Sequence, residues 1–305
     1  MVQLSAPGFR ERHLLPEPYW RADEMSVREQ RKAIRWYRGQ ILCLLFASVF
    51  GALTITVGRD KNLASALAVC AFAGAGVFTY LLRAEAPQAI WYQGRAAAES
   101  VKGLVWRYVV RARPFDGPAE STEADYAFLE QLGEVFLTHR GHGVIPTDAV
   151  PVITDEMRRL RALPLHARRD LYLQERLRAQ ALWYRSRADA YTTSTSKWSL
   201  ATGMAILAGI PLAALQIFEQ IPHVLGILST IGASITAWTQ LKQYRPLTSA
   251  YRLAAQELEQ LEGQLTRLIP ADADAELEWS RLARDAEATL AREQAVWRAR
   301  SDRRI

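Results

Sequence analysis

Four long apolar stretches, arranged in two closely spaced pairs, constrain the fold of this chain more than any other feature of its sequence. The first pair covers residues 41–57 and 63–82, and the second covers residues 198–218 and 221–241. None of the four contains Asp, Glu, Lys or Arg. Because a helix needs about 20 mostly apolar residues to cross a bilayer, the pattern predicts an all-α membrane protein with four transmembrane helices in two hairpins.

Basic residues predict the orientation of these hairpins. Of the 38 Lys and Arg residues, only Arg59 and Lys61 lie in the loop of the first hairpin, and none lies in the loop of the second. Lys and Arg near short loops stay on the cytoplasmic side, so both termini and the region between the hairpins are expected in the cytoplasm. The net charge of +6 then suits a surface of anionic lipids, and we favour this interpretation over nucleic-acid binding.

Apolar residues recur at steps of three and four outside the membrane stretches. Such spacing keeps one face of a helix against a partner helix. The membrane helices are therefore expected to continue into a cytoplasmic helical or coiled-coil bundle. The residues of the three faces are Ile90, Gly94, Ala97, Val101, Leu104 and Tyr108; Leu173, Leu177, Gln180, Tyr184, Ala188 and Tyr191; and Tyr251, Ala254, Leu258, Leu261, Leu265 and Leu268.

The region between the two hairpins is less regular around residues 116–165. Ser121 or Thr122 is expected to cap one short helix, and Thr154 a second helix with acidic residues in its first turn. The predicted organisation is an N-terminal two-transmembrane unit over 1–115, a connector with short helices over 116–165 and a C-terminal two-transmembrane unit over 166–305.

Aromatic residues and prolines are spaced alike in the two halves. In both, a proline just beyond the second apolar stretch is followed at the same distance by a tyrosine and then an alanine. Both halves enter the membrane from the same side, so the pattern indicates a parallel duplication, with chance enrichment of aromatics near the membrane as the alternative. The matching positions are Pro87, Tyr92 and Ala96 in the first half and Pro246, Tyr251 and Ala255 in the second.

A wider motif surrounds the second hairpin. It consists of Arg176, Gln180, Trp183, Tyr184 and Ala188 before the hairpin and Pro246, Tyr251 and Ala255 after it. With this motif the second half resembles a SLATT domain, a two-transmembrane effector domain found beside bacterial nucleotide-synthesising (SMODS) and nucleotide-sensing (SLOG) proteins. The first half resembles a divergent unit of the same family.

The resemblance implies a multi-pass protein of the bacterial inner membrane that acts in antiphage conflict. It implies an oligomeric effector that forms a gated pore, or ion channel, or otherwise permeabilises that membrane. We expect no fused sensor domain, so sensing would come from the cytoplasmic helices or from a separate protein. The expected partners are a nucleotide second messenger or a separate sensor protein, besides lipid and further copies of the chain. The alternative is a non-conducting scaffold that recruits a cytosolic partner through its helices, and a solute transporter comes third.

Small and hydroxyl-bearing residues are the candidates for lining a pore. Those in the fourth stretch recur every four residues and therefore share a helix face. Helix packing is the alternative for each of them, and the acidic candidate at the outer mouth would favour cations or is a solvated loop charge. The candidates are Gly226, Thr230, Ser234, Ser48, Thr56 and Glu219.

No sequence signature of an enzyme is present. The chain has no Gly-rich phosphate loop, no HExxH and no nucleophile elbow. Its two cysteines lie in separate apolar stretches, and no further ligand completes a metal site around His139 and His142. We therefore predict no catalytic residue, cofactor or metal.

Overall fold

The computed structural model describes residues 11–53, 56–57, 61–138, 152–217, 224–267 and 274–302. These residues are almost entirely helical and form two compact units. Unit 1 comprises Met1–Glu29, Ala89–Arg187 and Ala250–Ile305, and unit 2 comprises Gln30–Gln88 and Ala188–Ser249. The four apolar stretches of the sequence belong to unit 2.

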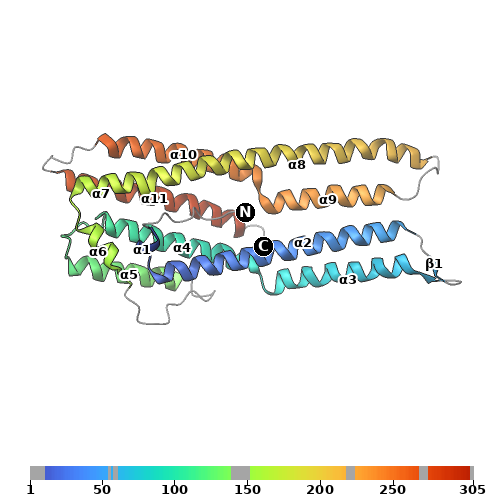
Figure 1. Ribbon diagram of the computed structural model, residues 1–305, viewed down its shortest axis with the longest axis horizontal. Coiled ribbons are helices and arrows are strands. Elements are labelled where there is room, and N and C mark those ends of the chain that lie inside the picture. The colour runs from blue at the N-terminus through green and yellow to red at the C-terminus, as the bar shows by residue number, and fades with distance from the viewer. Residues whose placement is uncertain are drawn as a thin grey trace. The chain divides into compact units, whose positions relative to one another are not determined.

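Four helices carry the apolar stretches of unit 2. They are α2 (Glu17–Ala52), α3 (Leu63–Ala84), α8 (Ala179–Ile217) and α9 (Val224–Lys242). Helices α2 and α8 are long because each begins in the residues of unit 1 and continues without a break into unit 2. Figure 1 shows α2 and α3 as the two arms of a hairpin.

The first apolar stretch differs from its prediction at its C-terminal end. Helix α2 ends at Ala52, and β1 (Thr56–Val57) pairs antiparallel with β2 (Lys61–Asn62). The β-branched Thr56 and Val57 favour extended backbone. The side chain of Asn62 then accepts from the amides of Ala64 and Ser65 and caps α3.

Small residues allow α2 and α3 to approach closely. A Cβ atom on Gly39 would lie 2.5 Å from the ring of Phe78, so only glycine leaves room for that ring. The Gln40 amide donates to the Thr79 hydroxyl at 2.8 Å in the same contact. On α3, Ala64, Ala68 and Ala75 are buried, as expected for helices packed through small side chains.

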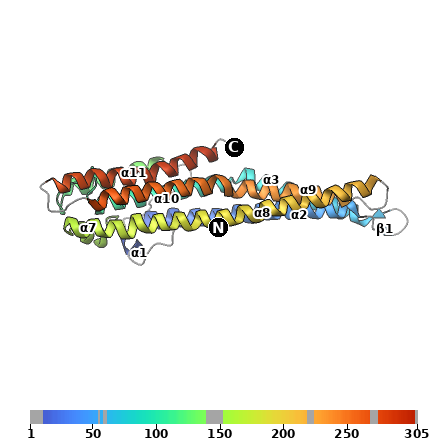
Figure 2. The ribbon, with the colours of Figure 1, turned by 90° about the horizontal axis from the view of Figure 1, so that it is seen from above.

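Unit 1 is built from shorter helices and from the extensions of the long ones. Figure 2 shows its longer helices running along a common direction. Its elements are α1 (Glu11–Leu14), α4 (Pro87–Val109) from Ala89 onward, α5 (Thr122–Thr138), α6 (Asp155–Arg161), α7 (Leu165–Tyr172), the π-helix η2 (Leu173–Arg178), α10 (Tyr244–Arg267) from Ala250 onward and α11 (Ala275–Asp302).

The helix faces predicted from apolar spacing are buried almost throughout. Every residue of the face from Leu173 to Tyr191 is at most 9% exposed. The caps are confirmed as well, because the hydroxyls of Ser121 and Thr154 accept amide hydrogens in the first turns of α5 and α6. The predicted positions Leu268, His139 and His142 lie outside the described residues.

Two equivalent joints interrupt the helical path beyond the second and fourth apolar stretches. Helix α3 gives way to α4 at Ala86, with φ of 40°, and α9 gives way to α10 at Gln243, with φ of 49°. Both residues carry a Cβ in the left-handed region that normally favours glycine. The first joint is followed directly by Pro87, which suits the first position of a helix. Each half of the chain therefore has one continuous long helix and one broken one.

Two helical stretches of the described residues have the length and composition needed to cross a membrane. They lie within Leu63–Val109 and Leu165–Leu215. The core helix of a soluble protein can pass the same test, but such a helix is mostly buried. Here only 11% and 0% of the two apolar windows are buried within the structure.

Candidate functional site

The pore-lining candidates Ser48, Thr230 and Gly226 come together in unit 2, where α2 contacts α9. The Ser48 hydroxyl lies 3.1 Å from the Gly226 carbonyl oxygen and donates to it. The Thr230 hydroxyl lies 3.0 Å from Ser48 Oγ and 2.9 Å from the same carbonyl. We call these three residues the hydroxyl cluster. Its hydrogen bonds join the first half of the chain to the second. This arrangement agrees with helix packing, the alternative to pore lining considered for these residues.

The remaining pore candidates are not part of this cluster. Ser234 is half-buried on α9, two turns beyond Gly226. Thr56 lies in β1, and its side chain is outside the described residues, as is Glu219 altogether.

The aromatic residues of the family motif form a cluster in unit 1. Trp183 and Tyr184 of α8 meet Tyr251 of α10, with ring centroids 5.6 and 5.4 Å from that of Tyr251. In the first half, Tyr92 stacks on Trp91 with centroids 4.6 Å apart. Edge and stacked contacts of this kind stabilise packed helices beyond the area that they bury. Tyr92 and Tyr251, which follow Pro87 and Pro246 at the same distance, therefore contribute to helix packing, whereas Pro246 itself is exposed.

Two charged residues form a buried ion pair in unit 1. Arg176 of η2 donates from Nε and Nη2 to the two carboxylate oxygens of Glu287 in α11, both at 2.9 Å. Each side chain is only 3% exposed. The Tyr172 hydroxyl donates to Glu287 as well, at 2.9 Å. The motif position Arg176 thus has a defined partner, and its neighbour Gln180 is also buried.

The ionisation of this group follows from its surroundings. Burial by itself would lower the pKa of Arg176, but the charge and hydrogen bonds of Glu287, with a contribution from Glu99, raise it above its usual value. Burial, followed by the charge of Glu287, raises the pKa of Tyr172 well above the usual value for tyrosine. At neutral pH Arg176 therefore carries its positive charge and Tyr172 remains a neutral donor.

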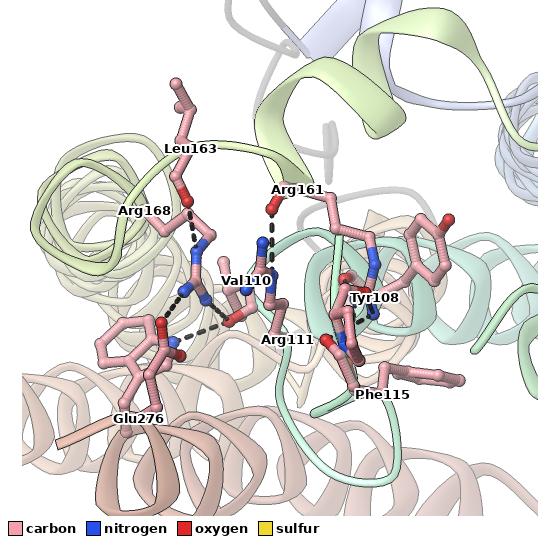
Figure 3. A network of polar contacts seen from close by, with 11 residues as sticks. Tyr108, Val110, Arg111, Phe115, Arg161, Leu163, Arg168 and Glu276 are labelled. Atoms are coloured by element: carbon pink, nitrogen blue, oxygen red, sulfur yellow. Dashed lines mark hydrogen bonds and ion pairs between the residues drawn. The ribbon is translucent and has the colours of Figure 1, made fainter. Parts of the chain in front are cut away.

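Arginine side chains occupy the C-terminal end of α4 (Figure 3). Nη1 of Arg161 donates to the carbonyls of Tyr108 and Phe115, at 2.7 and 2.9 Å, and its Nη2 donates to two further carbonyls in the turn that follows. The last carbonyls of a helix have no partner within it, so a guanidinium with several fixed donors satisfies them efficiently. Burial lowers the pKa of Arg161 to about 10, which leaves it charged at neutral pH.

A second arginine extends this network to α11. Arg168 Nη1 and the Trp279 indole both donate to the Val110 carbonyl, at 2.9 and 2.7 Å, and Arg168 also pairs with Glu276. Arg111 closes the group by donating to the Arg161 carbonyl at 3.1 Å. Figure 3 shows these contacts converging on the same turn. The network is structural, because its donors are directed at protein carbonyls and at one carboxylate, that of Glu276.

No pattern in the sequence predicts these buried charges. The predicted connector contains Arg161 and ends just before Arg168, and the carbonyls that these arginines reach at and beyond the end of α4 lie 43 to 58 residues away in the chain. Glu287 is separated from Arg176 by 111 residues. Only the motif position Arg176 could be selected in advance, and its partner could not.

The described residues hold no group of three or more His, Cys, Asp or Glu side chains placed to bind a metal ion. The two cysteines, Cys43 and Cys70, are free thiols.

Comparison with known families agrees with the tandem arrangement. Residues 16–169 match the SMODS and SLOG-associating 2TM effector domain 3, and residues 172–297 match the SMODS and SLOG-associating 2TM effector domain 1. No curated protein and no solved structure shows significant similarity to the chain. The first match runs through the region predicted as a connector. The prediction of two units is confirmed, and the chain belongs to the SLATT family of two-transmembrane effector domains and carries two of them in tandem.

Proposed function

We propose that this protein is an oligomeric membrane effector that permeabilises the bacterial inner membrane through a gated pore when a nucleotide-linked conflict signal reaches its cytoplasmic helices. The observation that carries the proposal is the pair of family matches, each to a two-transmembrane effector domain. In this proposal α2, α3, α8 and α9 cross the membrane as two hairpins. Unit 1 and both termini lie in the cytoplasm, and residues 116–165 connect the two halves.

The surface of unit 2 supports insertion. Large apolar side chains on α3 and α8 are exposed over much of their area. Burying a side chain of this kind stabilises a protein by about 1.5–3 kcal/mol, and soluble monomers rarely leave large contiguous apolar areas uncovered. Lipid or another subunit is therefore expected to cover them. They include Val69, Phe72 and Tyr80 on α3 and Leu200, Ile206, Leu207 and Ile210 on α8.

Conduction would require more than one chain. Two hairpins enclose little space between them, and closed rings are the usual form of homo-oligomers. Because Ser48 and Thr230 satisfy one another, we assign them to packing between α2 and α9 within a subunit. Ser234, half-buried on α9, remains the better pore-lining candidate among the described residues.

A non-conducting scaffold is the second candidate. The hydroxyl cluster favours a scaffold, because Thr230 donates to Ser48 and Ser48 donates to the Gly226 carbonyl. These hydroxyls therefore form hydrogen bonds within the protein. A scaffold would recruit a cytosolic partner through unit 1 and need no polar path across the membrane.

Two variants of α9 separate these functions. Ser234→Leu should abolish or strongly reduce ion flux and leave assembly intact if α9 lines a pore. Thr230→Val, which keeps the side-chain shape and loses the hydroxyl, should lower stability by about 0.5–1.5 kcal/mol and leave conductance per assembled channel unchanged. The measurements are single-channel current and oligomer size in the same membranes. Flux that is present but unaffected by Ser234→Leu would exclude the proposed pore face.

A further inference from the structure

Two cations, Arg38 and Lys242, lie against the ring of Trp238 near the C-terminal end of α9. The guanidinium of Arg38, on α2, lies 5.4 Å from the centroid of the Trp238 ring, and Lys242 Nζ, one helical turn after Trp238, lies 5.0 Å from the same centroid. All three residues belong to unit 2. Contact with an aromatic face is favourable for each cation, but it places two like charges around one ring, where they repel each other.

No carboxylate among the described residues compensates this pair. Within the described parts of the chain, neither Arg38 nor Lys242 has an acidic side chain within ion-pair distance, and the Trp238 indole N–H donates to no protein acceptor. A neighbouring group provides the contrast. Lys32 also lies over a tryptophan, with Nζ 4.8 Å from the Trp36 centroid, but it is paired with Glu85. Among the described side chains, no acidic residue pairs with Arg38 or Lys242 in the way that Glu85 pairs with Lys32.

We infer that Arg38, Trp238 and Lys242 form a binding site for a phosphate group. A guanidinium offers a planar set of donors that matches phosphate oxygens, and an ammonium adds a compact positive charge. The indole N–H supplies a further donor. A phosphate held by all three would neutralise the like charges and, because Arg38 is on α2 and Lys242 on α9, would tie the first half of the chain to the second.

The phosphate has two sources with the same chemistry. One is the headgroup of an anionic phospholipid, because Trp, Lys and Arg at the cytoplasmic end of a membrane helix lie at headgroup depth. The other is the phosphate of a soluble nucleotide. The lipid source rests on the proposed membrane insertion of α9, whereas the phosphate site itself requires neither conduction nor oligomerisation.

The test compares lipid retention by the full chain in nanodiscs. Native mass spectrometry would measure how many phosphatidylglycerol molecules each protein retains relative to phosphatidylcholine. The proteins compared are the wild type, R38Q/K242Q, the charge-preserving R38K/K242R and K32Q. The last removes a cation that already has its carboxylate. A second arm titrates ATP, a cyclic dinucleotide and inorganic phosphate onto the same variants in detergent.

Removing two cations near an anionic surface should weaken phosphatidylglycerol binding by about 25-fold, while K32Q stays within a factor of about three of the wild type. R38K/K242R keeps both charges but changes the donor geometry, so it should lose clearly less binding than R38Q/K242Q. Loss of nucleotide binding confined to R38Q/K242Q would support the site with a soluble phosphate as its source. The site is overturned if R38Q/K242Q matches the wild type in both arms, or if K32Q loses as much as R38Q/K242Q. A chain that fails to enter nanodiscs contradicts the proposed function, and the detergent arm still decides the phosphate site.

Discussion

At the scale of single residues, the buried Arg176–Glu287 pair links η2 to α11. Removing one partner leaves the other charge buried without compensation, which typically costs about 3–5 kcal/mol. Arg176→Met and Glu287→Leu should each lower the free energy of unfolding by about that amount, measured by denaturant titration in detergent. The double variant should recover most of the loss, because it removes both charges.

The exposed Arg185–Glu259 pair provides the matched control. Its side chains are 58% and 37% exposed, so Arg185→Met should change stability by less than about 1 kcal/mol. Equal losses in Arg176→Met and Arg185→Met would contradict the importance assigned to the buried pair.

A second residue, Asp23 of α2, makes unit 1 sensitive to pH. Burial, and then the charge of Glu99, raise the pKa of Asp23 above its usual 3.8, and its Oδ1 has no hydrogen-bond partner among the described residues. Between 3.8 and the raised value the folded protein holds a proton that the unfolded chain has released. The stability contribution is therefore greatest at low pH and is lost as pH rises.

Asp23→Asn removes this pH-dependent penalty. It should raise the thermal midpoint at pH 7, with a gain that shrinks as pH falls toward 4. Thermal scans of both proteins between pH 4 and 8 measure the difference. Glu24→Gln, the corresponding change at the exposed next position, should show only a small part of this gain, because Glu24 contributes least among the charges that raise the pKa of Asp23. A gain for Asp23→Asn that persists at pH 4 would contradict the assignment.

At the scale of elements, the two joints combine helix breaks with backbone strain. Ala86 has φ of 40° and Gln243 has φ of 49°, and a side chain in this region costs roughly 1–2 kcal/mol. Glycine relieves that strain but makes the unfolded chain more flexible. Ala86→Gly and Gln243→Gly should therefore each stabilise the protein by up to about 1 kcal/mol, measured as a shift in the unfolding midpoint.

Ala84→Gly is the control, because Ala84 is exposed in the last turn of α3. Glycine inside a helix costs about 0.5–1 kcal/mol relative to alanine, so the sign should be opposite at a position only two residues away. Destabilisation by both Ala86→Gly and Ala84→Gly would show that Ala86 stores no strain.

The elements themselves could largely be predicted, because their signals are local. Apolar spacing selected the buried face from Leu173 to Tyr191, and capping residues located the starts of α5 and α6. The contacts between elements could not be predicted from the sequence, because hydrogen bonds such as that between Thr230 and Ser48 join residues 182 positions apart. The same holds for the carbonyls that Arg161 satisfies, since any arginine in the chain offers identical donors.

At the scale of the whole molecule, the proposal requires four crossings with both termini in the cytoplasm. In a chain whose Cys43 and Cys70 are replaced by serine, single cysteines at Lys61 and Gln220 should react with a membrane-impermeant thiol reagent added outside intact spheroplasts. Cysteines at Glu120 and Asp274 should react only after permeabilisation. Labelling of position 120 in intact cells, or protection of position 61 or 220, would contradict the two-hairpin topology.

The central claim, a gated permeability of the membrane, is tested most directly by ion efflux from liposomes that contain the purified full-length chain. The measurement is made without ligand and with a panel of cyclic nucleotides. We predict efflux that a nucleotide switches on, or constitutive efflux if the missing partner normally holds the pore shut. An inserted, oligomeric protein that remains silent with every nucleotide and with its candidate sensor would contradict the claim and favour the scaffold.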